Sequence, residues 1–222
     1  MARLLRVRFF DVRLVFAGEP DALPADAAAA RQRFLDAGGL VLAEIPDISR
    51  WSLIVDGLFG IGLARAPAGR YAEWIDTANR LAKRDGCPLL ALDCPSGLNA
   101  DTGQVFSPAI QATHTITFIA AKPGLFTADG PDQCGEIKVA DLALDVATTA
   151  EADARLISTD AFAALLRLRR NNTHKGSFGS AGILGGSDPT TANISRVALS
   201  AAFMSALAFF ATLARLKESH GP

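Results

Sequence analysis

The sequence lacks the charge excess by which proteins that bind nucleic acids or membrane surfaces are recognised. It has no excess charge, since 22 basic and 23 acidic residues leave a net charge of −1. A domain that binds nucleic acid usually carries a basic stripe and interleaved aromatic residues, and the sequence has neither. We therefore expect no nucleic-acid partner and no attachment to a membrane by charge.

Cysteine and histidine are also scarce. The three cysteines, Cys87, Cys94 and Cys134, have no metal-ligand spacing, and their odd number argues against a disulfide framework. The three histidines lie far apart and predict neither a zinc site nor a His-based catalytic triad. We expect reduced thiols, buried or half-buried, in a cytoplasmic protein.

Long hydrophobic runs are missing as well. The first ten residues are basic, but Asp11 and Arg13 interrupt any apolar stretch, which argues against a secretory signal. Residues 197–213 carry no charge, yet they fall short of the roughly 18 to 20 apolar residues that a spanning helix needs. We expect a buried or orphaned helix there and no membrane segment.

The chain does have an alternation of short apolar strands and amphipathic helices. Half of its residues are apolar and a fifth are charged, as in a soluble globular protein. Strands that alternate with helices predict an α/β fold with a mostly parallel sheet covered on both faces. We expect strands at 11–16, 40–45, 53–55, 89–92, 115–119 and 136–139, and helices at 20–36 and 69–84.

Two of the expected strands end in an aspartate that leads into a glycine-bearing loop. Asp56 follows residues 51–55, which are apolar except for Ser52, and Asp93 follows the apolar residues 88–92. In parallel sheets ligands bind beyond the carboxyl ends of the strands, so the two loops are expected to form one site.

Gly60 and Gly62 belong to the first of these loops. Without side chains they leave backbone N–H groups open to phosphate oxygens. An ordinary tight turn would explain Gly-x-Gly by itself, but its pairing with the Asp93 loop favours a phosphate site. A dehydrogenase is disfavoured, because no Gly-x-Gly-x-x-Gly turn follows a first strand.

Three longer blocks resemble a known family. They are VDGLFGIGL at 55–63, LDCPSGLNADTG at 92–103, and the segment 113–145. Together they resemble the NAD(P)H-hydrate epimerase domain, also called the YjeF N-terminal domain. The residues HKGSFG and AGILGGS, within 174–187, resemble the opening of the ADP-dependent NAD(P)H-hydrate dehydratase domain with which it is often fused.

The resemblance implies a domain organisation and a fold. Residues 1–145 would be the epimerase domain, a Rossmann-like three-layer αβα sandwich with a mostly parallel sheet. Residues 146–170 would be a linker with a short helix at 160–168, and 171–222 an incomplete remnant of a ribokinase-like dehydratase domain. The Asn-Asn-Gly-Gly-Asp-Gly loop of the family has no counterpart here. We therefore expect the domain to lack its first strand as well.

The resemblance also implies a reaction. An isomerase of this family interconverts the S and R forms of hydrated NADH and NADPH, NADHX and NADPHX, in nicotinamide nucleotide repair. ADP or ATP would serve only the dehydratase (lyase) part, whose activity we expect to be lost. The protein would be cytoplasmic, with a homo-oligomer possible. We expect this chain itself to be impaired or inactive. A non-catalytic nucleotide-binding protein on the same fold is the open alternative.

The resemblance also implies site residues, which are the positions of this sequence that match the family's motifs. Asp93 matches the substrate-contacting acid and is the expected catalytic residue. Lys122 is expected to face the site, although a solvated loop lysine is the competing interpretation. Asp56 and Ser96 match the ligands of a potassium ion, against the alternative that they only make local turn hydrogen bonds. The expected phosphate-side loop consists of Gly60, Ile61, Gly62, Leu63, Ala64, Arg65 and Ala66.

Overall fold

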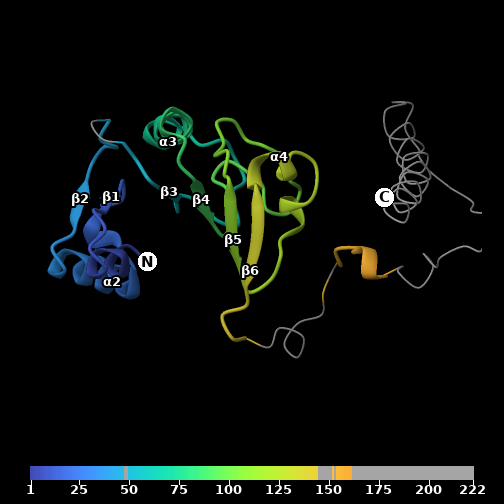
Figure 1. The fold of residues 1–222 in the computed structure, drawn as a ribbon, viewed down its shortest axis with the longest axis horizontal. Helices are drawn as coiled ribbons and strands as arrows, with labels where there is room; N and C mark the ends of the chain where they lie inside the picture. Colours follow the sequence, from blue (N-terminus) through green and yellow to red (C-terminus); the bar gives the residue numbers. More distant parts are fainter. Residues whose placement is uncertain (48–49, 145–151, 153, 162–222) are drawn as a thin grey trace, which may run out of the picture. The chain divides into compact units, whose positions relative to one another are not determined.

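The computed structural model describes residues 1–47, 50–144, 152 and 154–161 (Figure 1). The chain divides into two compact units, 1–156 and 157–222. Almost all described residues belong to the first unit, and the elements below are part of it. The expected helices at 160–168 and 197–213, and the segment 174–187 that resembles a dehydratase, lie wholly or mainly outside the described residues. The domain boundary at residue 145 stays a prediction.

Four parallel strands form the main sheet. Their order is β3 (Ile54–Asp56), β4 (Leu89–Leu92), β5 (His114–Phe118) and β6 (Glu136–Ala140), and every neighbouring pair is parallel (Figure 1). The strands expected at 53–55, 89–92, 115–119 and 136–139 are thus confirmed to within one residue at each end. Because all four strands run the same way, their carboxyl ends meet at one edge of the sheet.

Two further strands form a separate small sheet. β1 (Arg13–Val15) pairs in parallel with β2 (Leu40–Leu42), and α1 (Ala2–Val7) and α2 (Ala25–Asp36) accompany them. The α/β class with parallel strands is confirmed. In the described part of the chain, however, the strands fall into two sheets, because β1 and β3 are not paired with each other.

The helix expected at 20–36 begins later than predicted. Residues Pro20–Ala22 form a single 3₁₀ turn, and the helix proper starts at Ala25. Proline disfavours helical geometry in the residue before it, and Leu23, which precedes Pro24, is extended with φ −69° and ψ 138°. The second strand likewise ends at Leu42 rather than at residue 45.

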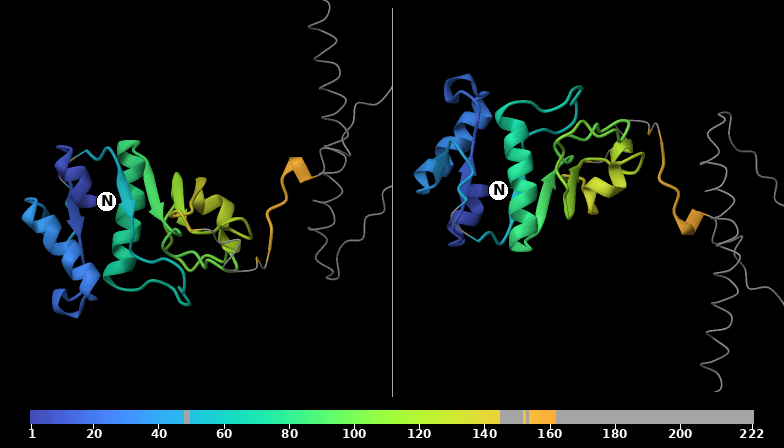
Figure 2. Two further views of the ribbon diagram at one scale, coloured as in Figure 1. Left: turned by 90° about the horizontal axis from the view of Figure 1, so that it is seen from below. Right: turned by 90° about the horizontal axis from the view of Figure 1, so that it is seen from above.

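One cluster of the core lies between α3 (Arg70–Asp85) and the main sheet. The helix expected at 69–84 is confirmed, and its apolar spacing places Ile75 and Ala78 against Leu89 and Ala91 of β4. Figure 2 shows α3 beside this strand. This packing carries the chain from the end of β3 back to the start of β4, so that Asp56 and Asp93 reach the same edge.

A second core cluster packs the loop that follows β4 against later parts of the chain. Cys94 and Leu98 pack against Leu125, in the 3₁₀ turn Pro123–Leu125, and against Cys134, in α4 (Gly130–Cys134). The three cysteines are free and buried, as expected. Burial raises the pKa of Cys94 to about 12 and that of Cys134 to about 11, so both thiols stay protonated at neutral pH. They serve packing and are poor nucleophiles.

Within the described residues, no helix combines the length and apolarity needed to cross a membrane.

Candidate functional site

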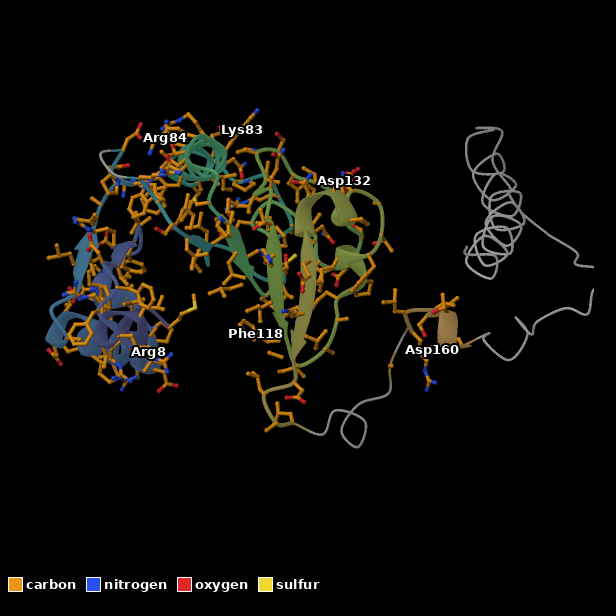
Figure 3. All side chains as sticks on the ribbon, viewed as in Figure 1. Arg8, Lys83, Arg84, Phe118, Asp132 and Asp160 are labelled. Atoms are coloured by element: carbon orange, nitrogen blue, oxygen red, sulfur yellow. The ribbon has the colours of Figure 1, made fainter. Side chains whose placement is uncertain are left out.

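The polar groups of the candidate site lie at the carboxyl edge of the main sheet. Asp56 is the last residue of β3, and Asp93 directly follows β4. Phe118, labelled in Figure 3, ends β5, and Lys122 precedes the 3₁₀ turn that follows. Three neighbouring strands therefore deliver these groups to one edge, as the sequence predicts.

Asp56 and Ser96 form a buried hydrogen-bonded pair. The Ser96 hydroxyl donates to Asp56 Oδ1 at 2.7 Å, and the Ser96 backbone N–H donates to Oδ2 at 2.8 Å. The side chains are almost inaccessible, with residue exposures of 4% for Asp56 and 0% for Ser96. The Ser96 hydroxyl also accepts a hydrogen bond of 2.9 Å from the backbone N–H of Phe59. This contact joins the loop after β3 to the loop after β4.

The carboxyl group of Asp56 is buried without a cationic side chain. Its hydrogen bonds come from the neutral donors Ser96 and Leu58, and no ion pair to it occurs in the part of the chain that the structure describes. Burial raises the pKa of Asp56, and those hydrogen bonds oppose the rise only in part. A carboxylate taken out of water with no partner charge is costly, so a nearby monovalent cation would stabilise it.

The donor atoms around Asp56 suit a monovalent cation. They are oxygens: the carboxylate, the Ser96 hydroxyl and the Phe59 carbonyl, which lies 3.3 Å from that hydroxyl. Oxygen donors with one formal charge fit a hard, weakly held ion, whereas zinc takes nitrogen and sulfur ligands. Among the described residues, no group of three or more His, Cys, Asp or Glu side chains could hold a metal ion. The residues present fit a potassium ion.

Asp93 and Lys122 form an ion pair beside this site. Lys122 Nζ lies 2.7 Å from Asp93 Oδ1 and 2.7 Å from the Phe118 carbonyl oxygen. The side chains of Lys122 and Asp93 are 17% and 21% exposed, so Lys122 is not a solvated loop lysine. Burial raises the pKa of Asp93, but the hydrogen bonds from Lys122 and the Phe118 backbone outweigh it and lower the pKa overall. Asp93 is therefore ionised at neutral pH.

The glycine loop after β3 borders a pocket. Residues 59–65 line a space of about 330 Å³, and this set contains all of the expected phosphate-side loop except Ala66, which is exposed. Gly60 lies against the catalytic candidate, since a Cβ atom on it would be 3.2 Å from Asp93 Oδ2. The structure thus brings the start of this loop to Asp93.

Several contacts at the site were not predicted from the sequence. The Thr117 hydroxyl and the Phe118 N–H each donate to Asp93 Oδ1 at 3.3 Å. Asn99 Nδ2 donates to the Leu63 carbonyl at 3.4 Å and ties the loop lining the pocket to the Asp93 loop. No sequence signal singles out Thr117, because His114 and Thr115 are further polar residues of the same strand. Asp101 lies in a turn closed by Asn99, as expected, and is exposed.

Comparison with known proteins places the chain in a family. The family described as "YjeF-related protein N-terminus" matches residues 1–124. The bifunctional NAD(P)H-hydrate repair enzyme Nnr of Escherichia coli strain K12 is 38% identical over 196 residues. That match covers 87% of this chain but 37% of the relative, so the chain spans little more than a third of its length.

One further relative agrees with this placement, and one solved structure shares the fold. The NAD(P)H-hydrate epimerase of Bordetella parapertussis is 39% identical over 155 residues, covering 68% of this chain and 66% of that protein. The crystal structure of the yeast protein ynu0 shares the fold, with a TM-score of 0.51 at 16% identity over 72% of this chain and 68% of the yeast chain. The chain therefore belongs to the YjeF-related N-terminal family.

Proposed function

We propose that this protein epimerises hydrated NADH and NADPH, taking the S and R forms of NADHX and NADPHX as substrates. The observation that carries the proposal is the Asp93 carboxylate, ionised and held by Lys122 against the start of the pocket loop at Gly60. Relatives 38% and 39% identical bear names that specify NAD(P)H-hydrate repair and epimerisation, which supports the same substrate class here. We do not extend the proposal to ADP-dependent dehydration.

Each group of site residues would have its own role in the proposed reaction. Inversion at the hydroxyl-bearing ring carbon requires its bond to the ring nitrogen to break and to re-form on the other face, while the hydroxyl proton leaves and returns. Asp93 would take up and return the proton as general base and general acid. The loop at Gly60 and Gly62 would receive the pyrophosphate on its backbone N–H groups, with charge assistance from Arg65, which lines the pocket. Lys122 would hold the Asp93 side chain.

The test is the interconversion of epimers. Purified protein is incubated with a single NADHX epimer in potassium buffer, and the two epimers are separated by chromatography. We expect conversion clearly above the spontaneous rate measured without protein. Soluble, folded protein that leaves the spontaneous rate unchanged would contradict the proposal.

The small size of the pocket favours one second candidate function. The protein would then bind the nucleotide without converting it. The pocket of about 330 Å³ lies at the small end of ligand sites, and one loop provides its lining. A binding-only domain would retain NADHX in equilibrium dialysis and show no conversion in the chromatographic assay. The epimerase proposal requires both binding and conversion.

We further propose that Asp56 and Ser96 hold a potassium ion, which would neutralise the buried carboxylate. Burial raises the pKa of Asp56 in the folded protein. Without a cation, the free energy of unfolding therefore falls as pH rises through that raised pKa and the carboxyl group ionises. Potassium competes with the proton, so its stabilising effect should be larger at neutral than at acidic pH. At saturating potassium we expect a gain of about 1–3 kcal/mol in the free energy of unfolding.

Thermal melts in potassium chloride and in choline chloride, at both pH values, measure this effect. Asp56→Asn should remove the potassium response, and the same change at the exposed Asp101 should leave it intact. Equal melting temperatures in the two salts at neutral pH would refute the ion assignment.

A further inference from the structure

The two carboxylate oxygens of Asp93 have different surroundings. Oδ1 receives hydrogen bonds from Lys122 Nζ at 2.7 Å, and from the Thr117 hydroxyl and the Phe118 N–H at 3.3 Å each. No hydrogen bond reaches Oδ2 from the part of the chain that the structure describes. Instead Oδ2 faces Gly60, where an added Cβ atom would lie only 3.2 Å away. One oxygen is held by the protein, and the other is left available on the side of the glycine loop.

The backbone helps to fix this arrangement. Asp93 has φ +70°, in the left-handed region that non-glycine residues seldom adopt. Its N–H nevertheless donates to the Ile116 carbonyl at 2.7 Å, so β5 fixes the backbone on one side. Lys122 is anchored in turn, because its ammonium group also donates to the Phe118 carbonyl at 2.7 Å. The carboxylate is held at both its backbone and one of its oxygens, as a preorganised catalytic group must be.

We propose that Lys122 is the positioning residue of this site, which occupies Oδ1 so that Oδ2 alone exchanges the proton with the substrate. The inference rests on the proposed epimerase function. In the forward step the O–H bond of the substrate hydroxyl breaks and the Oδ2–H bond forms. The electron pair left on the oxygen forms a C=O bond as the bond from that carbon to the ring nitrogen breaks, with its pair staying on the nitrogen. In the reverse step the nitrogen adds to the other face of the carbonyl group, and Oδ2 returns the proton to the oxygen. One proton is taken and one returned, so no oxidant or reductant is consumed.

Lys122→Met tests the positioning role, because it keeps the length of the side chain and removes its charge. Without the ammonium group, burial acts on Asp93 with less opposition, and the pKa of its carboxyl should rise. We expect kcat to fall by about 10- to 100-fold, as for a misplaced catalytic group, with the acidic limb of the pH–rate profile moved to higher pH. Lys122→Arg should recover part of the rate.

The control and a second readout separate positioning from damage to the fold. Lys83→Met, at an exposed position on α3 away from Phe118 in Figure 3, should retain the wild-type rate. Carbon-detected NMR titration of the Asp93 carboxyl in wild type and Lys122→Met follows the same pKa without any turnover. A wild-type kcat and an unchanged carboxyl titration in Lys122→Met would overturn the inference.

A second pair of variants tests the assignment of Oδ2. Gly60→Ala places a methyl group 3.2 Å from Oδ2, whereas Gly57→Ala meets only Leu92, at an ordinary 3.6 Å. We expect Gly60→Ala to lower kcat at saturating substrate by about 10- to 100-fold, because access to the exchanging oxygen is blocked. Gly57→Ala should stay close to wild type. A folded Gly60→Ala protein with a wild-type kcat and a changed KM would contradict the assignment. It would show that the loop binds phosphate but does not control access to Oδ2.

These outcomes are distinguishable from failure of the proposed function. If wild type does not interconvert the epimers, the epimerase proposal and the proton role of Oδ2 fall together. The NMR titration then still decides whether Lys122 controls the charge of Asp93. If wild type is active and the variants behave like it, only the inference about Lys122 and Oδ2 fails.

Discussion

Asp93→Asn is expected to lower kcat for epimer interconversion by about 10²- to 10⁴-fold, the usual contribution of a general acid–base group. Asparagine has nearly the same shape and can still accept the hydrogen bond that Lys122 donates to Oδ1. It cannot take up a proton at neutral pH, so the proton transfer itself is lost. Rates are measured by chromatography with saturating NADHX, and circular dichroism checks that the variant is folded.

The control for this variant is the same substitution in the same loop. Asp101→Asn changes an exposed turn residue and should leave kcat unchanged. In wild type, the pKa of Asp93 lies below its ordinary value, because hydrogen bonds from Lys122 and Phe118 outweigh the effect of burial. Activity that depends on the ionised carboxylate should therefore persist from neutral into mildly acidic pH. An Asp93→Asn protein with wild-type kcat would remove Asp93 from the mechanism.

Gly97→Ala is expected to cost about 2–4 kcal/mol of the free energy of unfolding, through backbone strain and overlap together. Gly97 has φ +97°, and a Cβ atom there would lie 2.5 Å from both the Ala109 Cα and the Pro108 carbonyl oxygen. Both are backbone atoms, so neither can move aside by a side-chain rotation. The loop next to Ser96 would have to shift, and the hydrogen bonds between Ser96 and Asp56 would weaken.

Urea denaturation measures this loss, and a second glycine separates its two causes. Gly86 has φ +63° but no atom within 4 Å of an added Cβ. Gly86→Ala should therefore show the conformational cost alone, about 1–2 kcal/mol. Equal losses for the two variants would mean that the overlap at Gly97 is relieved without cost, and that the loop after β4 is less rigid than its packing indicates.

The strands and the helix that build the site could be predicted from the sequence. The apolar run at 89–92 and the spacing of Trp74, Ile75, Ala78 and Leu81 are local patterns, and both elements are where they were expected. At Pro24 the local sequence pattern predicts the wrong start for the helix. The alanines after it continue a helical pattern, but the proline forces the preceding residue out of helical geometry and delays the start.

The sequence by itself determined which residues stand at the strand ends: Asp56 at the end of β3, Asp93 directly after β4, and the glycines between them. Parallel strands bring their carboxyl ends together, so a shared edge was predictable from the order of elements. Only the tertiary structure decided that Lys122, 29 residues from Asp93, reaches its Oδ1 and leaves Oδ2 toward Gly60. It also decided that β1 and β3 do not pair. Such contacts depend on strand order and packing between distant segments, which local spacing in a sequence does not encode.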